Sequence, residues 1–436
     1  MSEKMTAMIA QAETDLLHTY NRYQIVLDKG EGVYLYDTDG KKYLDYMSGI
    51  GVYALGYGNE AYNNALKAQI DKILHTSNYF YNEPAMEAAH KIKEVSGLDR
   101  VFFTNSGAEA VEGALKAALK HFWRREQAGG VLSAQTGTGA AGEGGAGQAG
   151  PDGILPEIIA MEHSFHGRTL GALAVTGNAH YREGYGQLPC RARFAQYNDL
   201  ASVEALINEH TAGIILETVQ GEGGVVPGTR EFLEGVRSLC TKHDVPLILD
   251  EVQCGMGRTG YMYAWQQFTD AGGNYTVKPD IMSTAKALGC GVPVGAFLVT
   301  EEIARKSLTA GDHGTTYGGN PFACAAVCEV LNQFEERDIT GHVREIAPYL
   351  EQQLDGMASR CACITGRRGS GLMQALVFDR PVAPVIAEAM ENGLILINAG
   401  ANVLRFLPPL VITKEDVDAM VSILEPAITS AFRAAS

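Results

Sequence analysis

The chain has 436 residues, of which 35 are lysine or arginine and 51 are aspartate or glutamate, so its formal net charge is −16. This acidic balance argues against a nucleic-acid-binding protein, because such affinity comes mainly from lysine and arginine contacts with phosphates. Hydrophobic residues make up 46% of the chain and charged residues 20%, which is typical of a globular protein. The length suggests about two or three domains.

Three features predict a cytoplasmic protein. The first ten residues contain a lysine and no long apolar core, which makes a poor signal peptide. The weakly charged stretch 281–300 is interrupted by Lys286 and contains glycines and a proline, which disfavours a membrane span. The eight cysteines include no C-x-x-C pair and no zinc-type cluster with histidine, so we expect reduced thiols and no metal site.

The predicted elements begin with a β-hairpin over residues 32–45 that turns at Asp39 and Gly40. Short β-branched runs then alternate with helical patterns, which predicts β-α units and a largely parallel sheet. The expected strands are Val101–Thr104, Glu157–Met161, Gly213–Leu216, Val245–Leu249, Asp280–Thr284 and Val294–Val299. The expected helices are Ala108–Trp123, Ala201–Glu209, Arg230–Lys242, Pro321–Glu336 and Val343–Ala358.

These elements predict a division into domains. We expect residues 1–60 to join residues 323–436 in a smaller α+β domain, with residues 61–322 forming the large domain. The segment 129–150 interrupts the pattern, because nine of its 22 residues are glycine and only one is charged. Such a segment buries too little to offset its ordering entropy, so we interpret it as a mobile surface insertion. No Gly-Lys-Ser/Thr sequence ends it, which argues against a phosphate loop.

The chemistry of the chain is first suggested by Lys286, the only charged residue between Asp280 and Glu301. Its surroundings are small and apolar, and desolvation there would lower its pKa, as an amine that forms a Schiff base requires. The alternative is a lysine that extends from a loop into solvent.

Two further features support a pyridoxal phosphate (PLP) site. An apolar strand delivers Asp250 to its carboxyl end, where a carboxylate could keep a pyridinium nitrogen protonated, although it could equally cap a turn. In the sequence 104–108 a strand runs through a glycine turn into a helix, and free N–H groups there suit a phosphate. A simple cap by Ser106 is the competing explanation.

Together these residues resemble the class III aminotransferases, which are fold-type-I PLP enzymes. The matching sequences are TNSGAE (104–109), SFHGRT (164–169), ETVQGEGG (217–224), DEVQCGMGRTG (250–260), STAKALG (283–289) and GTTYGGNP (314–321). The likeness covers roughly residues 20–430. Residues 76–84, 197–199 and 402–410 are most similar to the members that act on acetylornithine. Thr218 and Cys254 depart from the family pattern without removing a functional group.

The resemblance implies an α/β fold with a mainly parallel, seven-stranded sheet and a smaller domain from both chain ends. It also implies that Lys286 carries PLP covalently and later moves a proton, while Asp250 pairs with the pyridine nitrogen. The other cofactor-binding residues are expected to be Ser106, Gly107, Ala108, Phe165, His166, Glu251, Val252, Gln253 and Thr316. Thr316 would come from the neighbouring subunit, so we expect a homodimer.

Substrate contacts are implied at Arg168, for the α-carboxylate of the amino donor, and at Thr315. Arg405 is the only charged residue from Asn392 to Thr413, and a buried guanidinium needs a carboxylate. The family offers two in turn, namely the α-carboxylate of glutamate or 2-oxoglutarate, and Glu217 as a switch that covers the arginine. A purely structural ion pair is the alternative for Arg405.

The expected reaction is ping-pong transfer of the terminal amino group of N2-acetylornithine to 2-oxoglutarate. The products would be N-acetylglutamate 5-semialdehyde and glutamate, as in arginine biosynthesis. Ornithine, succinylornithine, 4-aminobutyrate and polyamine aminotransferases share Lys286, Asp250 and Arg405, so these donors stay open. A non-catalytic protein with the PLP fold would be favoured only if this set of residues were broken.

Overall fold

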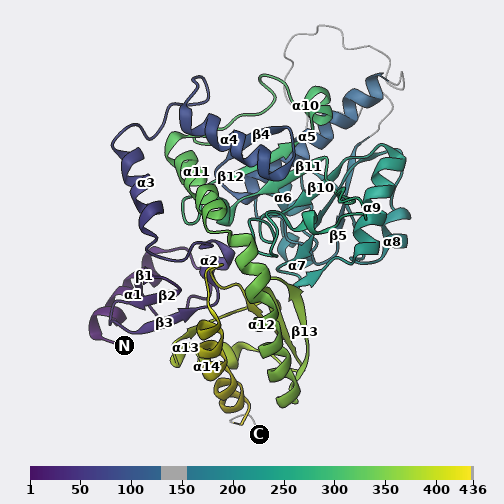
Figure 1. Ribbon diagram of the computed structural model, residues 1–436. Helices are drawn as coiled ribbons and strands as arrows, with labels where there is room; N and C mark the ends of the chain where they lie inside the picture. The colour runs from purple at the N-terminus through teal and green to yellow at the C-terminus, as the bar shows by residue number, and fades with distance from the viewer. Residues whose placement is uncertain (129–154, 434–436) are drawn as a thin grey trace.

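The computed structural model describes residues 1–128 and 155–433 (Figure 1). The glycine-rich segment 129–150 lies outside these residues, so its predicted mobility stays a prediction. Within the described ranges, no helix combines the length and the apolar character that a membrane crossing requires.

A seven-stranded sheet forms the centre of the larger part of the molecule, which confirms the expected fold class. In spatial order its strands are β4 (Arg100–Thr104), β12 (Gly295–Val299), β11 (Ile281–Thr284), β10 (Leu247–Asp250), β7 (Thr211–Glu217), β5 (Glu157–Met161) and β6 (Arg191–Ala195). β12 runs opposite to the other six strands. The inner strands β5, β7, β10 and β11 are buried throughout, as expected for a sheet covered on both faces.

Six of these strands were predicted, and the differences have local causes. β10 begins two residues later than expected, after Pro246, whose nitrogen cannot donate to the ladder. The edge strand β6 was missed because its sequence RARFA alternates arginines with apolar residues and is only partly buried. A strand on the edge of a sheet tolerates this polarity, since water can reach one side of it.

Helices cover the two faces of this sheet. α5 (Gly107–Ala128) packs on β7, β11 and β12 through an apolar stripe that includes Val111, Leu115 and Phe122. α9 (Arg230–His243) matches its prediction and begins at the cap residue Thr229. α8 (Leu200–Glu204) ends earlier than predicted, because Asn208 turns the chain toward β7 and donates to Glu157.

The remaining helices and short elements of the larger part are more peripheral. They are α3 (Glu60–Ile70), α4 (Glu83–Ser96), α6 (Leu170–Ala174), α7 (Ala179–Arg182), β8 (Val219–Gln220), β9 (Val226–Pro227), α10 (Glu301–Lys306), and the 3₁₀ turns Ala264–Gln267 and Lys286–Leu288.

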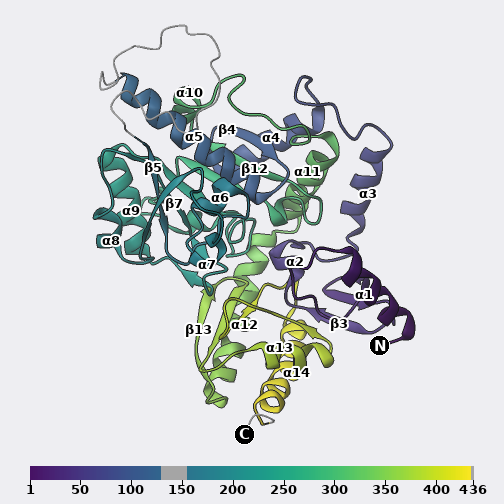
Figure 2. The ribbon, with the colours of Figure 1, turned by 180° about the vertical axis from the view of Figure 1, so that it is seen from behind.

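Both ends of the chain meet in a separate four-stranded sheet. The predicted hairpin is confirmed as β2 (Tyr34–Asp37) and β3 (Lys42–Asp45), flanked by β1 (Leu27–Glu31). β15 (Leu394–Ile395) pairs in parallel with β3. In Figures 1 and 2 the N-terminal strands therefore lie beside the C-terminal helices. This contact supports the proposed small domain, whose boundaries stay a prediction.

A third sheet in the C-terminal region has the order β13 (Ile364–Ser370), β14 (Met373–Phe378), β17 (Val403–Phe406) and β16 (Ile397–Asn398). The helices of the two chain ends are α1 (Glu3–Asp15), α2 (Ser48–Gly51), α11 (Pro321–Glu336), α12 (Ile339–Arg360), α13 (Ala383–Glu391) and α14 (Lys414–Arg433). α11 has the predicted bounds, and α12 extends beyond its prediction at both ends.

Candidate active site

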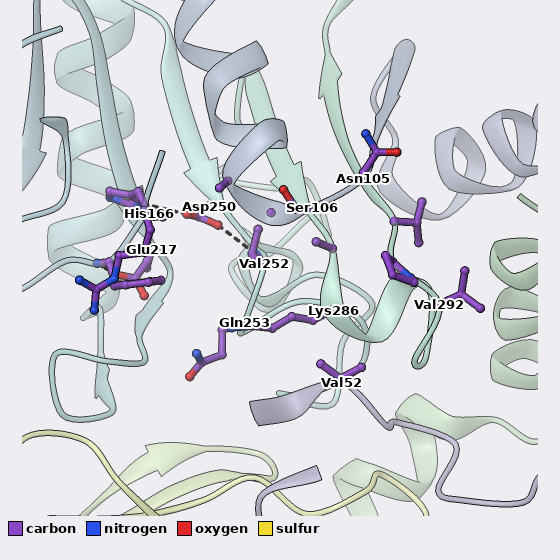
Figure 3. A pocket seen from close by; sticks show the side chains of 18 of the residues that line it. Val52, Asn105, Ser106, His166, Glu217, Asp250, Val252, Gln253, Lys286 and Val292 are labelled. Carbon is purple, nitrogen blue, oxygen red and sulfur yellow. Dashed lines mark hydrogen bonds and ion pairs between the residues drawn. The ribbon is translucent and has the colours of Figure 1, made fainter. Parts of the chain in front are cut away.

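A cavity of about 440 Å³ lies at the carboxyl edge of the seven-stranded sheet (Figure 3). Register explains why functional side chains gather there, since Asp250 at the end of β10 pairs with Glu217 of β7 and with Ser283 of β11. Most of the residues predicted from the sequence line the cavity. They are Ser106, Gly107, Ala108, Phe165, His166, Arg168, Glu217, Asp250, Val252, Gln253 and Lys286.

Asp250 is buried and held by two donors. Its Oδ2 lies 2.8 Å from Nδ1 of His166, and its Oδ1 accepts the N–H of Val252 at 3.0 Å, as the dashed lines in Figure 3 show. His166 is itself fixed, because its backbone N–H donates to the hydroxyl of Thr176. These contacts fix the direction of a carboxylate inside the cavity, where a cationic ring nitrogen could pair with it.

Lys286 follows β11 and begins the turn Lys286–Leu288. Its φ of 50° lies in the left-handed region, which is costly for a residue with a side chain and is found at functional sites. Burial lowers the pKa of the Lys286 ammonium, although the negative charge of Glu222 opposes this effect. A lysine with a lowered pKa is a better nucleophile and base near neutral pH.

The N-terminus of α5 forms the wall of the cavity above Lys286. The N–H groups of Gly107 and Ala108 precede the first helical hydrogen bond, so they can point at an anion. A side chain at position 107 would approach Val252 to 2.8 Å, so this turn requires glycine. A phosphate group fits these donors, and the buried carboxylate, lysine and helix terminus together fit PLP.

Glu217 lies at the end of β7, where both of its oxygens accept backbone hydrogen bonds. Oε1 accepts the N–H of Phe165 and Oε2 the N–H of Gly221, each at 3.0 Å. Burial raises the pKa of Glu217 to about 7, and the charge of Asp250 adds to the effect. Glu217 thus fixes the loop that carries Phe165 against the cavity.

The structure corrects the predicted partner of Arg405. Its Nη1 lies 2.6 Å from Oε1 of Glu222 and 3.0 Å from Oε1 of Gln253. The Glu217 oxygens instead accept backbone N–H groups, and within residues 1–128 and 155–433 no hydrogen bond or ion pair joins Glu217 to Arg405. Burial alone would raise the pKa of Glu222, but the charge and hydrogen bond of Arg405 lower it.

Sequence reasoning missed Glu222, although a signal was present. It stands in the same ETVQGEGG sequence as Glu217, so the motif offers two carboxylates close together in the chain. Motif spacing cannot select between them, because the fold decides which one faces β17.

Glu251 is a second correction, since its side chain does not line the cavity. It is fully buried behind Asp250 and accepts hydrogen bonds from the Thr218 hydroxyl at 2.6 Å and from the N–H groups of Ala264 and Trp265. The Cys254 thiol lies 3.5 Å from Oε2 of Glu251. Glu251 therefore supports the loop after β10 and does not reach a cofactor in the cavity.

Thr315 and Thr316 are outside the lining of the cavity in their own chain. The Thr315 hydroxyl accepts from Nδ2 of Asn105 at 3.2 Å, which places it at the rim. Thr316 is exposed beside it. Nothing within the single chain places Thr316 at a cofactor, so its role across a subunit interface stays a prediction.

Comparison with known proteins gives the family. The family model described as aminotransferase class-III matches residues 17–428. The acetylornithine aminotransferase of Methanocaldococcus jannaschii is 41% identical over 413 residues, which cover 95% of this chain and 96% of that protein. The acetylornithine aminotransferase of Aquifex aeolicus is 41% identical over 412 residues, covering 94% and 99%.

Solved structures agree with the sequence matches. An ornithine aminotransferase from Toxoplasma gondii, described with partial occupancy of PLP at its active site, superposes with a TM-score of 0.85 and 27% identity over 98% of this chain and 95% of that chain. The acetylornithine aminotransferase of Elizabethkingia anophelis gives a TM-score of 0.79 and 30% identity, covering 98% and 99%. The family and these neighbours imply PLP as the cofactor. Because the matches extend over nearly the whole length, the chain belongs to the class III aminotransferase family.

Proposed function

We propose that this aminotransferase moves the terminal amino group of N2-acetylornithine to 2-oxoglutarate, yielding N-acetylglutamate 5-semialdehyde and glutamate. The observation that carries the proposal is a pair of guanidinium groups near one buried lysine. Arg168 lines the cavity, and Arg405 contacts Gln253, which also lines it. N2-acetylornithine bears its carboxylate at the end remote from the reacting amine, 2-oxoglutarate bears a carboxylate at each end, and arginine is well suited to bind such groups. The names of the relatives at 41% identity support acetylornithine as the donor.

PLP would be held by the residues that meet its chemistry. The N–H groups of Gly107 and Ala108 would bind the phosphate, Asp250 the ring nitrogen, and Lys286 the aldehyde carbon. When bound, PLP supplies an aldehyde that condenses with amines and a ring that withdraws electrons from the adjacent carbon.

The chain itself supplies proton transfer, charge and shape. The lowered pKa of Lys286 favours a neutral Nζ, which can take the proton from the carbon that bears the amino group of the donor and, once protonated, can serve as the acid for a different atom. Asp250, held by His166, keeps a negative charge fixed inside the cavity. Phe165 forms a flat apolar wall that Glu217 holds in place.

Arg405 and Glu222 would decide which substrate binds. A 2-oxoglutarate carboxylate can replace the Glu222 carboxylate on Arg405, because both present the same charge to the same donors. While N2-acetylornithine reacts, Glu222 covers Arg405. This arrangement would let one cavity accept two unlike amino donors in turn.

We further propose that the enzyme is a cytoplasmic homodimer. Tyr79, Phe80 and Tyr81 are 95%, 71% and 93% exposed. They follow Asn78, whose side chain donates to the backbone of Thr315 and Gly318, so the exposed aromatic group lies beside Thr316. Covering this apolar surface with a second copy would also bring Thr316 toward another active site. Sedimentation of the purified protein tests the dimer.

The test of the reaction is a single turnover without keto acid. The holoenzyme is mixed separately with N-acetylornithine, ornithine, 4-aminobutyrate and putrescine, and the loss of the cofactor absorbance band is followed. We expect N-acetylornithine to give the largest second-order rate constant. A larger constant for another donor would contradict the proposed substrate, and a band that no amine bleaches would contradict amino transfer itself.

A further inference from the structure

A second cavity, of about 170 Å³, adjoins the active site. The two cavities share Phe165, and the smaller one is also lined by Asn178, Tyr181, Glu222 and Gly400. Two of its lining residues contact the arginines of the active site, since Tyr181 lies against Arg168 and Glu222 pairs with Arg405. Of the lining residues, Glu222 has a role in the proposed transfer, whereas Asn178, Tyr181 and Gly400 have none.

Tyr181 lines the smaller cavity and contacts Arg168, which lines the active site. Cζ of Arg168 lies 3.5 Å from the centre of the Tyr181 ring and 5.5 Å from that of Phe165. The two rings meet edge to face, with centres 6.1 Å apart. Within residues 1–128 and 155–433, no carboxylate forms an ion pair with Arg168. An aromatic face thus holds a guanidinium whose hydrogen-bond donors stay open to a ligand.

The charge of the smaller cavity restricts what can enter it. Its carboxylate, Glu222, is committed to Arg405 at 2.6 Å. Asn178 and Tyr181 are uncharged and can hydrogen bond to an amide. Arg405 already pairs with Glu222, and Arg168 lies against Tyr181, so these three charges sum to a net positive value that disfavours a free ammonium group. A neutral acylated nitrogen suffers no such penalty.

We propose that Arg168 and the smaller cavity form one subsite for the end of the amino donor remote from the reacting amine. Tyr181 is a positioning residue that orients Arg168 toward the carboxylate of the donor, and the cavity lined by Asn178 takes the acyl group on the α-nitrogen. This inference rests on the proposed function and deepens it, because it names the part of the protein that selects an acylated donor.

The first test isolates the carboxylate contact with two matched donors. N-acetylputrescine equals N-acetylornithine without its carboxylate. We expect Tyr181→Leu to lower kcat/KM for N-acetylornithine about tenfold more than for N-acetylputrescine, mainly through KM, because both donors share the acyl contact and only the first has the carboxylate. Tyr181→Phe retains the aromatic face and should restore the wild-type ratio between the donors. An equal loss for both donors in Tyr181→Leu would overturn the role of Tyr181.

The second test introduces a charge into the smaller cavity. The side-chain oxygen of Asn178 caps α7 by accepting the N–H of His180 at 3.1 Å, and Asn178→Asp keeps this acceptor while adding a carboxylate. We expect the ratio of kcat/KM for ornithine to that for N-acetylornithine to rise about tenfold, since the ammonium group of ornithine gains a partner. Both donors carry the α-carboxylate, so any effect on Arg168 cancels in the ratio.

The outcomes separate this inference from the proposed function. If the wild-type enzyme does not prefer N-acetylornithine, the proposed function fails. If the wild type prefers it but Asn178→Asp leaves the ratio unchanged, the acyl subsite alone is wrong. The cofactor absorbance spectrum of each variant serves as the control for an intact active site.

Discussion

The two halves of the active site are built in different ways. Asp250 and Glu217 stand at the ends of neighbouring strands of one sheet, in register, and Lys286 follows the next strand. Arg405, in contrast, comes from β17 of another sheet and reaches Glu222, which lies 183 residues earlier in the chain. The first half is fixed by a buried ladder of backbone hydrogen bonds, whereas the second joins its segments through side-chain contacts of Arg405 with Glu222 and Gln253.

This difference fits the two tasks. The groups that would hold PLP must keep their geometry through both half-reactions, and strand ends provide a rigid support. The arginine must exchange its partner, and an ion pair between side chains can do so. The side chain of Arg405 is 1% exposed whereas that of Glu222 is 28% exposed, so Glu222 is the partner that can move away.

The largest expected effect tests the rigid half. Lys286→Ala should lower the rate of both half-reactions by roughly 10⁴-fold or more, because it removes both the nucleophile and the proton carrier. Stopped-flow absorbance of the reconstituted variant with each substrate measures this loss. If Lys286→Ala carried out both half-reactions at close to the wild-type rate, another group would have to move the proton.

A smaller effect, confined to one half-reaction, is expected for the arginine. Arg405→Lys keeps the positive charge but loses the paired donors that match a carboxylate. The half-reaction with 2-oxoglutarate should slow by about 10- to 100-fold, while that with N-acetylornithine changes little. Separate half-reaction kinetics measure the two rates. A parallel loss in both would mean that Arg405 has a structural role.

Glu222→Gln and Glu217→Gln form a matched pair, since each replaces one carboxylate of the same motif by an amide. Glu222→Gln weakens the contact with Arg405, so the ratio of the glutamate to the N-acetylornithine half-reaction rates should rise about tenfold. Glu217→Gln should leave this ratio unchanged, because Glu217 contacts backbone N–H groups instead. If Glu217→Gln raised the ratio and Glu222→Gln left it unchanged, Glu217 would be the switch, as the sequence suggested.

The smallest expected effect concerns stability and pH. Burial raises the pKa of Glu217 from 4.5 to about 7, so the folded state binds the proton more tightly than the unfolded state. The contribution of Glu217 is therefore fully present below pH 4.5 and is lost as the pH rises through 7. Relative to Glu217→Gln, the unfolding free energy of the wild type should fall by about 1 to 3 kcal/mol from pH 5 to pH 8.

Urea unfolding of the two proteins without cofactor measures this difference. Glu222 supplies the contrast, since the pKa of this carboxylate is lowered and its contribution is lost only as the pH falls. The comparison of the wild type with Glu222→Gln should accordingly be flat between pH 5 and pH 8. If the unfolding free energy depended on pH as steeply for Glu222 as for Glu217, the opposite pKa shifts of the two carboxylates would be contradicted.

The sequence predicted the inner part of the molecule well. Apolar strands such as β7 and β5 are recognisable because every residue is buried, and β10 was recognised with a shift of two residues. It predicted the edge poorly, as β6 shows, since its mixed composition is compatible with a loop. Local signals likewise located Lys286 and Asp250, because isolation in an apolar run and position at a strand end can be read along the chain. For the partner of Arg405 the motif offered two carboxylates, Glu217 and Glu222, and no local pattern selected between them.

The sequence by itself determined the family, the α/β fold and the residues at strand and helix ends, because these depend on local patterns of burial and turn formation. Only the tertiary structure decided that Glu222 faces Arg405, that Glu251 turns away from the cavity toward Thr218, and that Tyr181 lies on Arg168. Each of these contacts joins segments whose approach is set by the packing of separate sheets and loops. Pairwise contacts of this kind follow from the fold as a whole, since no local pattern specifies which of two nearby carboxylates faces a distant arginine.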